Sequence, residues 1–503
     1  MRQTSFAGQA LAPAGAAPAG VQPRGRMRPR ARARRALQFA KDPYRLVLLL
    51  LVVLTVSRLH MAIPSLNKTH PLIVLTIAAL GVAWVRPELL AQRPLFATWP
   101  AKIVGAIAIW ALLGMFFGMS FGSTATFITE DFGKTLIFTF LILASIRTSR
   151  DLFTVIVAYI ASASWLVYQA VFHFHLEMEQ GGYYRLSHLD TYDANDLGLV
   201  LLLGLALTLL VFQVARWRGR IVVTGVLLGI AAAIAKSGSR GALVGLAAMA
   251  LASLVLLQAV PLWKRCAFIV AAVAGITLFA PSGYWKQMET IIHPENDYNW
   301  DSNHGRRAVA TRGIGYFKMF PVFGLGVGNF ERAECTPEIS PNARYRYAHG
   351  LGVWCEPPHN SYVEALAETG AGGIVLWVVM IPGAAVWLVL LRRRMPQHWL
   401  HGDGEQRFLY FAPMYLSIGI IAFSVGAFFL TFAWREVTFY IPGVVAGLDA
   451  AVAERMGREG IPGPLLPGSI GNVKLATRQV RRWIARPVAW GPRDPRAPRV
   501  ARR

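Results

Sequence analysis

A series of long apolar segments, which recurs from residue 44 to residue 453, is the feature that most constrains the fold of this chain. Most of the segments have about 17 to 25 residues, the length that an α-helix needs to cross a bilayer. Hydrophobic residues make up 54% of the 503 residues and charged residues only 16%, a balance that excludes an ordinary water-soluble globular protein. We therefore predict an all-α membrane protein with about 12 transmembrane helices.

The apolar pattern divides the chain into five predicted parts. They are a disordered basic tail (1–43), transmembrane helices one to nine (44–281), a large loop with short helices between spans nine and ten (282–370), transmembrane helices ten to twelve (371–453) and a second basic tail (454–503). The second and fourth spans are short, which leaves a tilted or partly re-entrant placement open. The predicted spans are 44–63, 70–86, 101–120, 132–147, 151–173, 195–214, 219–236, 241–260, 265–281, 371–391, 407–431 and 435–453.

The distribution of lysine and arginine predicts the orientation of the spans. Both tails are rich in arginine, and an even number of spans places them on one side of the membrane, which the positive-inside rule makes the cytoplasmic side. The even-numbered short loops also carry Lys and Arg clusters, whereas the odd-numbered short loops are poor in them. The large loop at 282–370 is therefore predicted to face outward, together with the connections at 174–194 and 236–240.

The net charge of +24 belongs mainly to this topological signal. We expect no nucleic-acid partner, because the body of the chain is embedded in lipid. The first 42 residues are rich in Ala, Pro and Arg and lack the apolar periodicity of a helix, so they are predicted to be disordered. The first span is predicted to be a retained anchor, because its apolar run is too long for a cleavable signal peptide.

Three cysteines occur in the chain. Cys266 falls within a predicted span, whereas Cys335 and Cys355 lie twenty residues apart in the outward loop, where the compartment is oxidising. We predict that these two form a disulfide. Two free thiols remain the alternative, because spacing alone does not establish the geometry of a disulfide.

Polar residues interrupt or precede the apolar spans in three predicted outward segments. The turn at 236–240 separates spans seven and eight, Arg185 precedes an Asp-x-Asn step at 193–195, and His359 and Asn360 precede span ten. A charge at the membrane boundary either reaches the lipid headgroups or faces a functional cavity.

These segments and the rest of the large outward loop contain four motifs in a fixed order along the chain. They are Arg185 with Asp193-Ala194-Asn195, then Ser239-Arg240-Gly241-Ala242, the Gly-rich run from Pro321 to Phe330, and His359-Asn360-Ser361-Tyr362-Val363-Glu364. In order and predicted side, the motifs resemble the O-antigen ligase and O-antigen polymerase superfamily, over residues 180–385. The resemblance implies a bacterial inner-membrane enzyme that transfers a glycan from undecaprenyl diphosphate to an acceptor hydroxyl on the periplasmic face.

The chemistry implied by the resemblance needs fixed positive charge beside the carrier. Negative charge grows on the departing diphosphate as the sugar C1–O bond breaks, and preorganised donors stabilise that charge. Arginine presents a permanently charged fork that matches phosphate oxygens. Arg185 and Arg240 are therefore the predicted donor diphosphate-binding residues.

The acceptor hydroxyl attacks well at neutral pH only if a base removes its proton. His359 is the predicted catalytic base, since histidine has a suitable unperturbed pKa and the resemblance assigns a similar role to a loop histidine. Two alternatives stay open: His359 caps the following helix, or His349 is the base. Arg306, Arg307, Arg312, Asn360 and Glu364 are predicted as further contacts to the acceptor or carrier.

No metal and no cofactor are expected. The acidic residues at 190–196 do not have the spacing of an EF-hand loop, and arginine charge can replace a cation. The implied partners are an undecaprenyl-diphosphate-linked glycan, a lipid A core or growing glycan as acceptor, and the lipid bilayer.

Three functions remain open from the sequence. The first is an O-antigen ligase, which joins a finished glycan to the lipid A core. The second is an O-antigen or exopolysaccharide polymerase of the same superfamily. The third is a small-solute transporter, which also fits a polytopic chain with broken spans. A two-half repeat is not visible in the sequence, and the polar motifs gather on one predicted side, which favours the first two.

Overall fold

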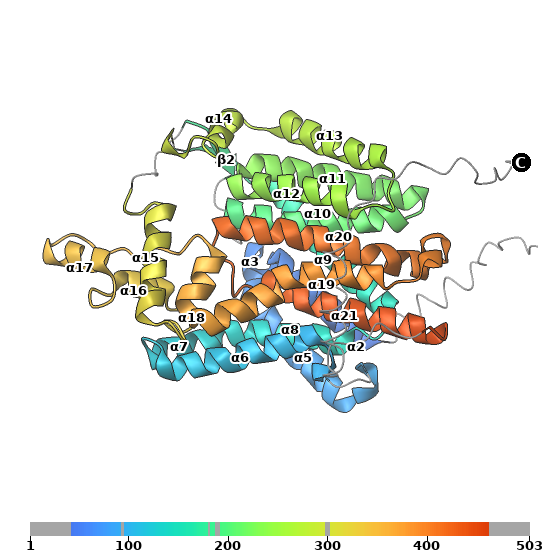
Figure 1. Ribbon diagram of the computed structural model, residues 1–503, viewed down its shortest axis with the longest axis horizontal. Helices are drawn as coiled ribbons and strands as arrows, with labels where there is room; N and C mark the ends of the chain where they lie inside the picture. The colour runs from blue at the N-terminus through green and yellow to red at the C-terminus, as the bar shows by residue number, and fades with distance from the viewer. Residues whose placement is uncertain (1–41, 92–94, 180–181, 187–191, 297–301, 462–503) are drawn as a thin grey trace, which may run out of the picture. The chain divides into compact units, whose positions relative to one another are not determined.

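The structure is a computed structural model that describes residues 42–91, 95–179, 182–186, 192–296 and 302–461. Most of its long helices run roughly along the horizontal direction of Figure 1. Two short strands, β1 (Leu176–Met178) and β2 (Tyr184–Leu186), pair antiparallel with Glu177 opposite Arg185. The predicted tails lie almost wholly outside the described residues.

The first half of the described chain contains twelve labelled α-helices. They are α2 (Pro43–Ser57), α3 (Leu59–Ala62), α4 (Pro64–Asn67), α5 (Pro71–Val85), α6 (Trp99–Phe117), α7 (Phe121–Phe127), α8 (Gly133–Ser145), α9 (Ser149–Tyr168), α10 (Ala194–Val214), α11 (Trp217–Ser237), α12 (Arg240–Leu256) and α13 (Leu262–Phe279). This part also contains two short 3₁₀ helices, at Pro87–Leu89 and Leu95–Ala97, and two π-helical turns, at Ile128–Phe132 and Gln169–His173.

The second half begins with short helices and ends with long ones. The helices are α14 (Tyr284–Glu289), α15 (Arg306–Met319), α16 (Phe330–Cys335), α17 (Pro341–Ala348), α18 (Ser361–Met380), α19 (Pro382–Arg393), α20 (Gly404–Gly426) and α21 (Glu436–Arg458). Short 3₁₀ turns lie at Pro294–Asn296, Gln397–His401 and Ala427–Phe429, the last of which is η7.

Local sequence signals set several helix starts. Thr148 and Asp151 form a capping box at the start of α9, and Asp403 and Gln406 form another at the start of α20. Each box pairs backbone N–H groups that the first helical turn leaves without a partner. These starts lie beside predicted cytoplasmic loops, where a polar residue costs little.

Eight helical stretches of the described residues are long and apolar enough to cross a membrane. Three shorter apolar helices, α2, α5 and α12, correspond to predicted spans one, two and eight. Predicted span four coincides with α8, which has only 13 residues. The chain is thus an all-α, multi-pass membrane protein, and the count of twelve spans stays a prediction. The eight stretches are Trp99–Phe117, Ser149–His173, Ala194–Val214, Trp217–Ser237, Leu262–Phe279, Ser361–Arg393, Gly404–Phe429 and Glu436–Arg458.

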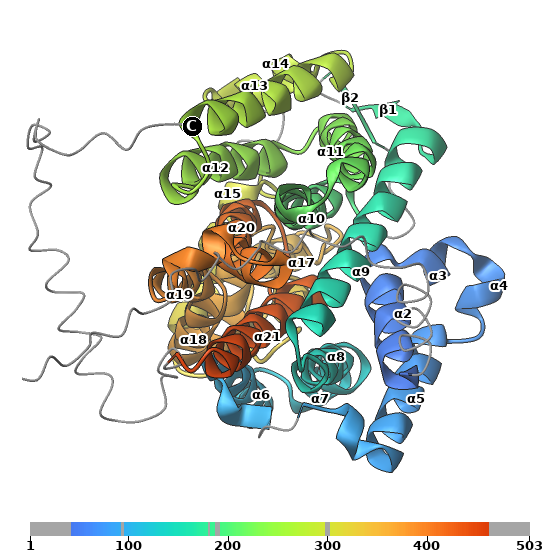
Figure 2. The ribbon, with the colours of Figure 1, turned by 90° about the vertical axis from the view of Figure 1, so that its right-hand side faces the viewer.

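Helices α10 and α20 form the centre of the bundle. α10 packs against α9, α11, α12 and α20, while α20 also packs against α12 and α19. Figure 2 shows these two helices surrounded by others, with α13 on the outside next to α11 and α12. The almost continuous apolar sequence of α10 follows from this position, since neither face of the helix meets water.

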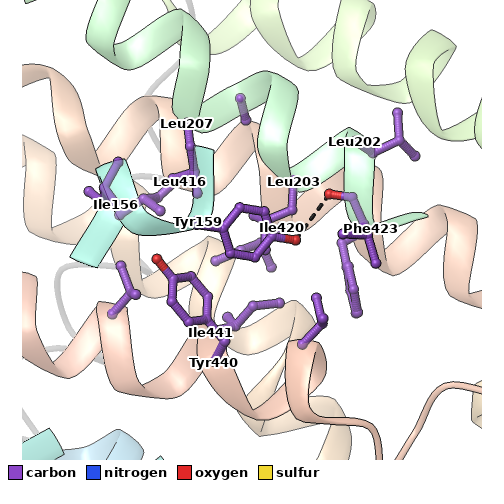
Figure 3. Close-up of a cluster of buried hydrophobic side chains, with 14 of the residues drawn as sticks. Ile156, Tyr159, Leu202, Leu203, Leu207, Leu416, Ile420, Phe423, Tyr440 and Ile441 are labelled. Atoms are coloured by element: carbon purple, nitrogen blue, oxygen red, sulfur yellow. Dashed lines mark hydrogen bonds between the residues drawn. The ribbon is translucent and has the colours of Figure 1, made fainter. Parts of the chain in front are cut away.

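Two buried tyrosines join α9 to its neighbours in the core. The rings of Tyr159 and Tyr440 pack with centroids 4.9 Å apart, among the leucine, isoleucine and phenylalanine side chains of Figure 3. The Tyr159 hydroxyl donates to the Val200 carbonyl (3.0 Å), and the Tyr440 hydroxyl donates to the Val155 carbonyl (3.2 Å). Since a buried hydroxyl without a partner is costly, these bonds fix how α9, α10 and α21 lie together.

The short helices gather at one end of the bundle. In Figure 1, α14 to α17 lie toward the left ends of the long helices. Residues 361–369 of the predicted loop are helical, because α18 already begins at Ser361. α18 breaks at Gly370, whose φ of 64° and ψ of −164° leave the helical region, before it continues into the bundle. At the other end, α21 continues to Arg458, past the predicted span end at residue 453.

Candidate active site

A cavity of about 560 Å³ lies where α10, α12, α15 and α18 begin. Its lining includes four arginines and a single aspartate, so its charge is positive. The lining residues are Tyr183, Arg185, Asp193, Asn195, Gly238, Arg240, Gln287, Thr290, Ile291, Pro294, Arg306, Arg307, Ala310, His359, Asn360, Phe428 and Phe429. The structure thus brings together six of the residues singled out in the sequence, namely Arg185, Arg240, Arg306, Arg307, His359 and Asn360.

Helix N-termini add to the positive character of the cavity. Asp193, Ser239 and Asn360 are the N-caps of α10, α12 and α18, and each side chain accepts hydrogen bonds from backbone N–H groups of the first turn. Aligned peptide dipoles place roughly half a positive charge at each helix start. An anion in this cavity therefore meets both arginine side chains and helix N-termini.

Arg240 is the first residue of α12 and follows a tight turn. Gly238 ends α11 in the left-handed region (φ 58°), which a residue with a Cβ rarely adopts, and Ser239 then caps α12. The Arg240 Nη1 atom donates to the Thr290 hydroxyl (2.7 Å), which itself donates to the Gln287 carbonyl (2.7 Å). The residues after α14 therefore hold the Arg240 guanidinium in place.

Arg185 reaches the cavity from the hairpin. It lies on β2 opposite Glu177, and its Nε atom is 3.9 Å from a carboxylate oxygen of Glu179. Gly238 permits this approach, since a Cβ there would lie 3.1 Å from the Arg185 Cβ and 2.8 Å from the Gln287 side-chain oxygen. The Arg185 side chain is 18% exposed, so most of it is removed from water.

Arg306 and Arg307 open α15, which packs against α18. The packing is close: a Cβ at Gly313 would lie 2.4 Å from Val363 and 2.9 Å from Phe330. The start of α15 is thereby fixed at the rim of the cavity. Both arginines lie in its first turn and line the cavity.

His359 lies in the cavity wall just before α18. Its backbone adopts the left-handed region (φ 48°), and its N–H donates to the Thr431 hydroxyl (3.0 Å). Burial, with the neighbouring charge of Arg306, lowers the pKa of His359 to about 4, while Asp193 acts in the opposite direction. The imidazole is therefore neutral at pH 7, which is the form that accepts a proton.

The residue that caps α18 is Asn360. Its side-chain oxygen accepts from the backbone N–H groups of Tyr362 (2.9 Å) and Val363 (3.1 Å). The helix thus has its cap without His359, which lines the cavity. His349, the rival base, lies at the exposed end of α17, where its ring packs on Tyr345 and does not line the cavity.

Two predicted contacts, Glu364 and Arg312, do not line this cavity among the described residues. The Glu364 carboxylate is buried and accepts from the backbone N–H of Ala433 (2.9 Å). Arg312 instead pairs with the fully buried carboxylate of Glu334, with Nε–Oε1 and Nε–Oε2 distances of 2.9 and 3.0 Å. Both side chains hold parts of the protein together beside the cavity.

The Gly-rich run at 321–330 is a tight connection between α15 and α16. Gly324, Gly326 and Gly328 have φ between 72° and 89°, and a Cβ at Gly324 would lie 2.3 Å from the Glu368 backbone. The Glu368 carboxylate accepts from the N–H groups of Gly328 and Phe330, both at 2.8 Å. The glycines let this run pack directly on α18.

Several cavity residues were not predicted from the sequence. Gln287 and Thr290 come from α14 and the turn after it, and Phe428 and Phe429 come from η7 after α20. The polar residues that directly follow predicted span nine were a sequence signal that could have identified Gln287 and Thr290. The sequence contains no such signal for Phe428 and Phe429, because both lie within a predicted apolar span.

Cys335 and Cys355 are joined as a disulfide in the structure, with Cα atoms 4.9 Å apart. Cys335 ends α16, and Cys355 lies four residues before His359. The bond thus closes the loop that carries α17 and ties it to the segment that leads into the cavity.

No group of three or more His, Cys, Asp or Glu side chains is placed to hold a metal ion within the described part of the chain. The charged groups of the cavity are instead guanidinium groups, helix N-termini and one aspartate that caps α10. This arrangement suits the binding of a phosphate or diphosphate beside a neutral imidazole.

Comparison with known families supports the motif resemblance. Residues 230–378 match the family model described as O-antigen ligase. The matched region contains Arg240, Arg306, Arg307 and His359, whereas Arg185 precedes it. No curated protein matches the chain. Over residues 230–378 the chain is therefore similar to the O-antigen ligase family.

Proposed function

We propose that this protein is an O-antigen ligase-like glycosyltransferase that moves a glycan from undecaprenyl diphosphate to an acceptor hydroxyl of the lipid A core. One observation carries the proposal: Arg185, Arg240, Arg306, Arg307 and His359 line a single cavity at one end of a bundle of apolar helices. The family match over residues 230–378 supports the same reaction class.

The arginines are proposed to bind the diphosphate of the donor. Arg185 and Arg240 come from two different elements, and two helix starts, those of α10 and α12, accompany them. A membrane-anchored diphosphate is an anion at the boundary of the bilayer, and its charge increases as the C1–O bond breaks. Fixed guanidinium groups stabilise that charge without needing to reorganise during the reaction.

His359 is proposed to be the catalytic base. The imidazole takes the proton of the acceptor hydroxyl, the acceptor oxygen forms the new bond to C1 of the sugar, and the C1–O bond to phosphate breaks with its electron pair on the diphosphate. Before the donor binds, the low pKa of His359 makes it a weak base. Burial is the main cause of this low pKa and the charge of Arg306 the second; the negative charge of a bound diphosphate offsets the second, so we expect donor binding to strengthen the base.

The finer topology belongs to the proposal. Twelve spans with both termini in the cytoplasm place the cavity on the periplasmic face of the inner membrane. All lining residues come from predicted outward segments or from helix ends next to them, at Tyr183–Asn195, Gly238–Arg240, Gln287–Ala310, His359–Asn360 and Phe428–Phe429. Scanning cysteine labelling of intact cells at the exposed positions 292 and 401 tests this placement: residue 292 should react from the periplasm and residue 401 should not.

Reconstituted transfer tests the function directly. The purified protein in liposomes should move glycan from undecaprenyl diphosphate to a lipid A core acceptor without added nucleotide, and the reaction should persist in EDTA. Lipid-linked product is read by gel electrophoresis and mass spectrometry. Extension of one carrier-linked glycan by another, without transfer to the core, would identify a polymerase instead. No transfer to either acceptor from a competent donor would refute the proposal.

A further inference from the structure

In the part of the chain that the structure describes, the ring of His359 has no partner of the kind that usually orients a catalytic histidine. Catalytic bases of this type are commonly aligned by a carboxylate or carbonyl on the second ring nitrogen. Within the described residues the His359 ring makes no hydrogen bond, and the one hydrogen bond of the residue that the structure defines runs from its backbone N–H. The direction of the ring therefore depends on the backbone that carries it and on the packing of this partly buried side chain.

That backbone is held in an uncommon conformation. A residue with a Cβ rarely adopts φ near 48°, and such a conformation persists only where neighbouring groups determine it. Pro358, which is buried, restricts the chain on one side, and Asn360 fixes the start of α18 on the other. Between these two residues, the Thr431 hydroxyl accepts from the His359 N–H at 3.0 Å.

Thr431 belongs to a segment that is joined repeatedly to the start of α18. The Ser361 hydroxyl donates to the Leu430 carbonyl (2.8 Å) and accepts from the Phe432 N–H (3.0 Å). The Ala433 N–H donates to Glu364 (2.9 Å). The connection between η7 and α21 thus lies along the His359 segment and is anchored to it at successive residues.

We propose that Thr431 is a positioning residue that sets the direction of the His359 imidazole through the backbone N–H of that histidine. Thr431 does not line the cavity, so it acts through His359 and does not contact the substrate. The inference rests on the proposed role of His359 as the base. It gives the segment after η7 a function: the segment holds the base at the angle that faces the acceptor, while the arginines hold the donor from other elements.

Thr431→Val tests the proposal, since valine keeps the shape of threonine and removes the acceptor. Kinetics with the undecaprenyl-diphosphate glycan should show kcat reduced about 10- to 100-fold, because a small misplacement of a catalytic group has an effect of this size. The KM for the donor should stay within about twofold, since the arginines are untouched. Thr431→Ser, which keeps the hydroxyl, should restore kcat to near the wild-type value.

Thr438→Val is the matched control. The Thr438 hydroxyl is buried and donates to the Phe432 carbonyl (2.6 Å), so this change loosens the same segment without touching His359. If the two variants have equal thermal stability, Thr438→Val should keep a much larger fraction of the wild-type kcat than Thr431→Val. Equal losses in the two variants would show that Thr431 has only a structural role and would overturn the proposal.

Folding and function are separated in the same experiment. Should Thr431→Val not purify as a folded protein, Thr431→Ala removes the acceptor with less apolar bulk and takes its place. Binding of undecaprenyl diphosphate to either variant shows that the cavity is formed. If the wild type is active and the Thr431 variant is equally active, the positioning role is rejected and the proposed function stands. If the wild type is inactive with competent donor and acceptor, the proposed function itself is rejected.

Discussion

The guanidinium of Arg240 is held by the hydroxyl of Thr290, with 2.7 Å between the Nη1 and Oγ1 atoms. The two residues are separated by α12, α13 and α14 in the sequence, yet they meet at the wall of one cavity. A flexible arginine that is fixed before the ligand arrives loses less side-chain entropy on binding. The turn between α11 and α12 thus places Arg240 at the cavity, and Thr290, at the end of α14, then aligns its guanidinium.

Arg240→Ala and Arg185→Ala should each lower kcat of glycan transfer about 100- to 1,000-fold, because each removes a fixed charge from the departing diphosphate. Arg→Lys at either position should recover only part of the rate, since lysine keeps the charge but loses the planar fork. Initial rates in liposomes with a defined lipid-linked glycan measure both effects.

Arg332→Ala is a suitable control for these variants, since Arg332 is exposed on α16 and does not line the cavity. Its transfer rate should match the wild type. Near-normal transfer by Arg240→Ala and Arg185→Ala would mean that these side chains bind lipid headgroups, and the diphosphate site would have to lie elsewhere.

The transfer reaction should depend on pH through His359. The pKa of about 4 in the free protein predicts that kcat/KM falls only as the pH drops toward 4, where the base becomes protonated. The acid limb of kcat should lie at higher pH, because a bound diphosphate raises the pKa of the imidazole. His359→Ala should reduce kcat by about 100-fold or more and remove the acid limb from the pH profiles of both kcat and kcat/KM.

His349→Ala provides the comparison, because His349 is exposed at the end of α17. It should retain the wild-type rate and pH profile. Loss of transfer in this variant, with activity preserved in His359→Ala, would reassign the base. Acid limbs of kcat and kcat/KM at the same pH would mean that the donor does not alter the pKa of His359.

Non-reducing peptide mapping of protein from the membrane should recover Cys335 and Cys355 in one linked peptide. On the chain-entropy model, closing a loop of this length stabilises the folded state by about 3 kcal/mol. Cys266, which is unpaired in the structure, should be alkylated in the unfolded protein without reduction and serves as the internal control. Alkylation of all three thiols before reduction would disprove the disulfide.

The sequence was sufficient to predict much of the cavity because its polar residues interrupt apolar segments. Arg185, Arg240 and His359 stand out for that reason, since a charge beside a span needs a partner or an aqueous cavity. The twelve predicted spans each overlap an observed helix, although helix lengths below 18 residues leave some of them unsettled as spans. Hydropathy locates segments but does not show which side chains face one another.

Arg312 and Glu364 illustrate what the sequence did not reveal. Arg312 follows Arg306 by six residues, which on an α-helix is a rotation of about 240°, so the two side chains leave α15 in different directions. The direction becomes known only when the start of α15 and its packing on α18 are known. Glu364 likewise occupies a motif position in the sequence but lies against the segment after η7. Polar character alone did not separate cavity residues from buried structural contacts.

Arg312 and Arg307 should therefore differ in what their replacement changes. Arg312→Ala leaves the buried Glu334 carboxylate without its cation, which should destabilise the protein by about 3 to 5 kcal/mol. Arg307→Ala should lower the rate of transfer at temperatures where the variant is folded, because Arg307 lines the cavity. Unfolding of both variants in detergent, followed by transfer rates at a temperature where both are folded, measures the contrast.

The double variant Arg312→Met with Glu334→Leu completes this test. Replacing both charges with apolar side chains of similar size removes the unpaired carboxylate, so most of the lost stability should return. Arg312 is then a structural residue if the double variant transfers glycan at near the wild-type rate. A stable double variant that has lost transfer would show instead that Arg312 contacts the substrate, in line with its position near the other arginines in the sequence.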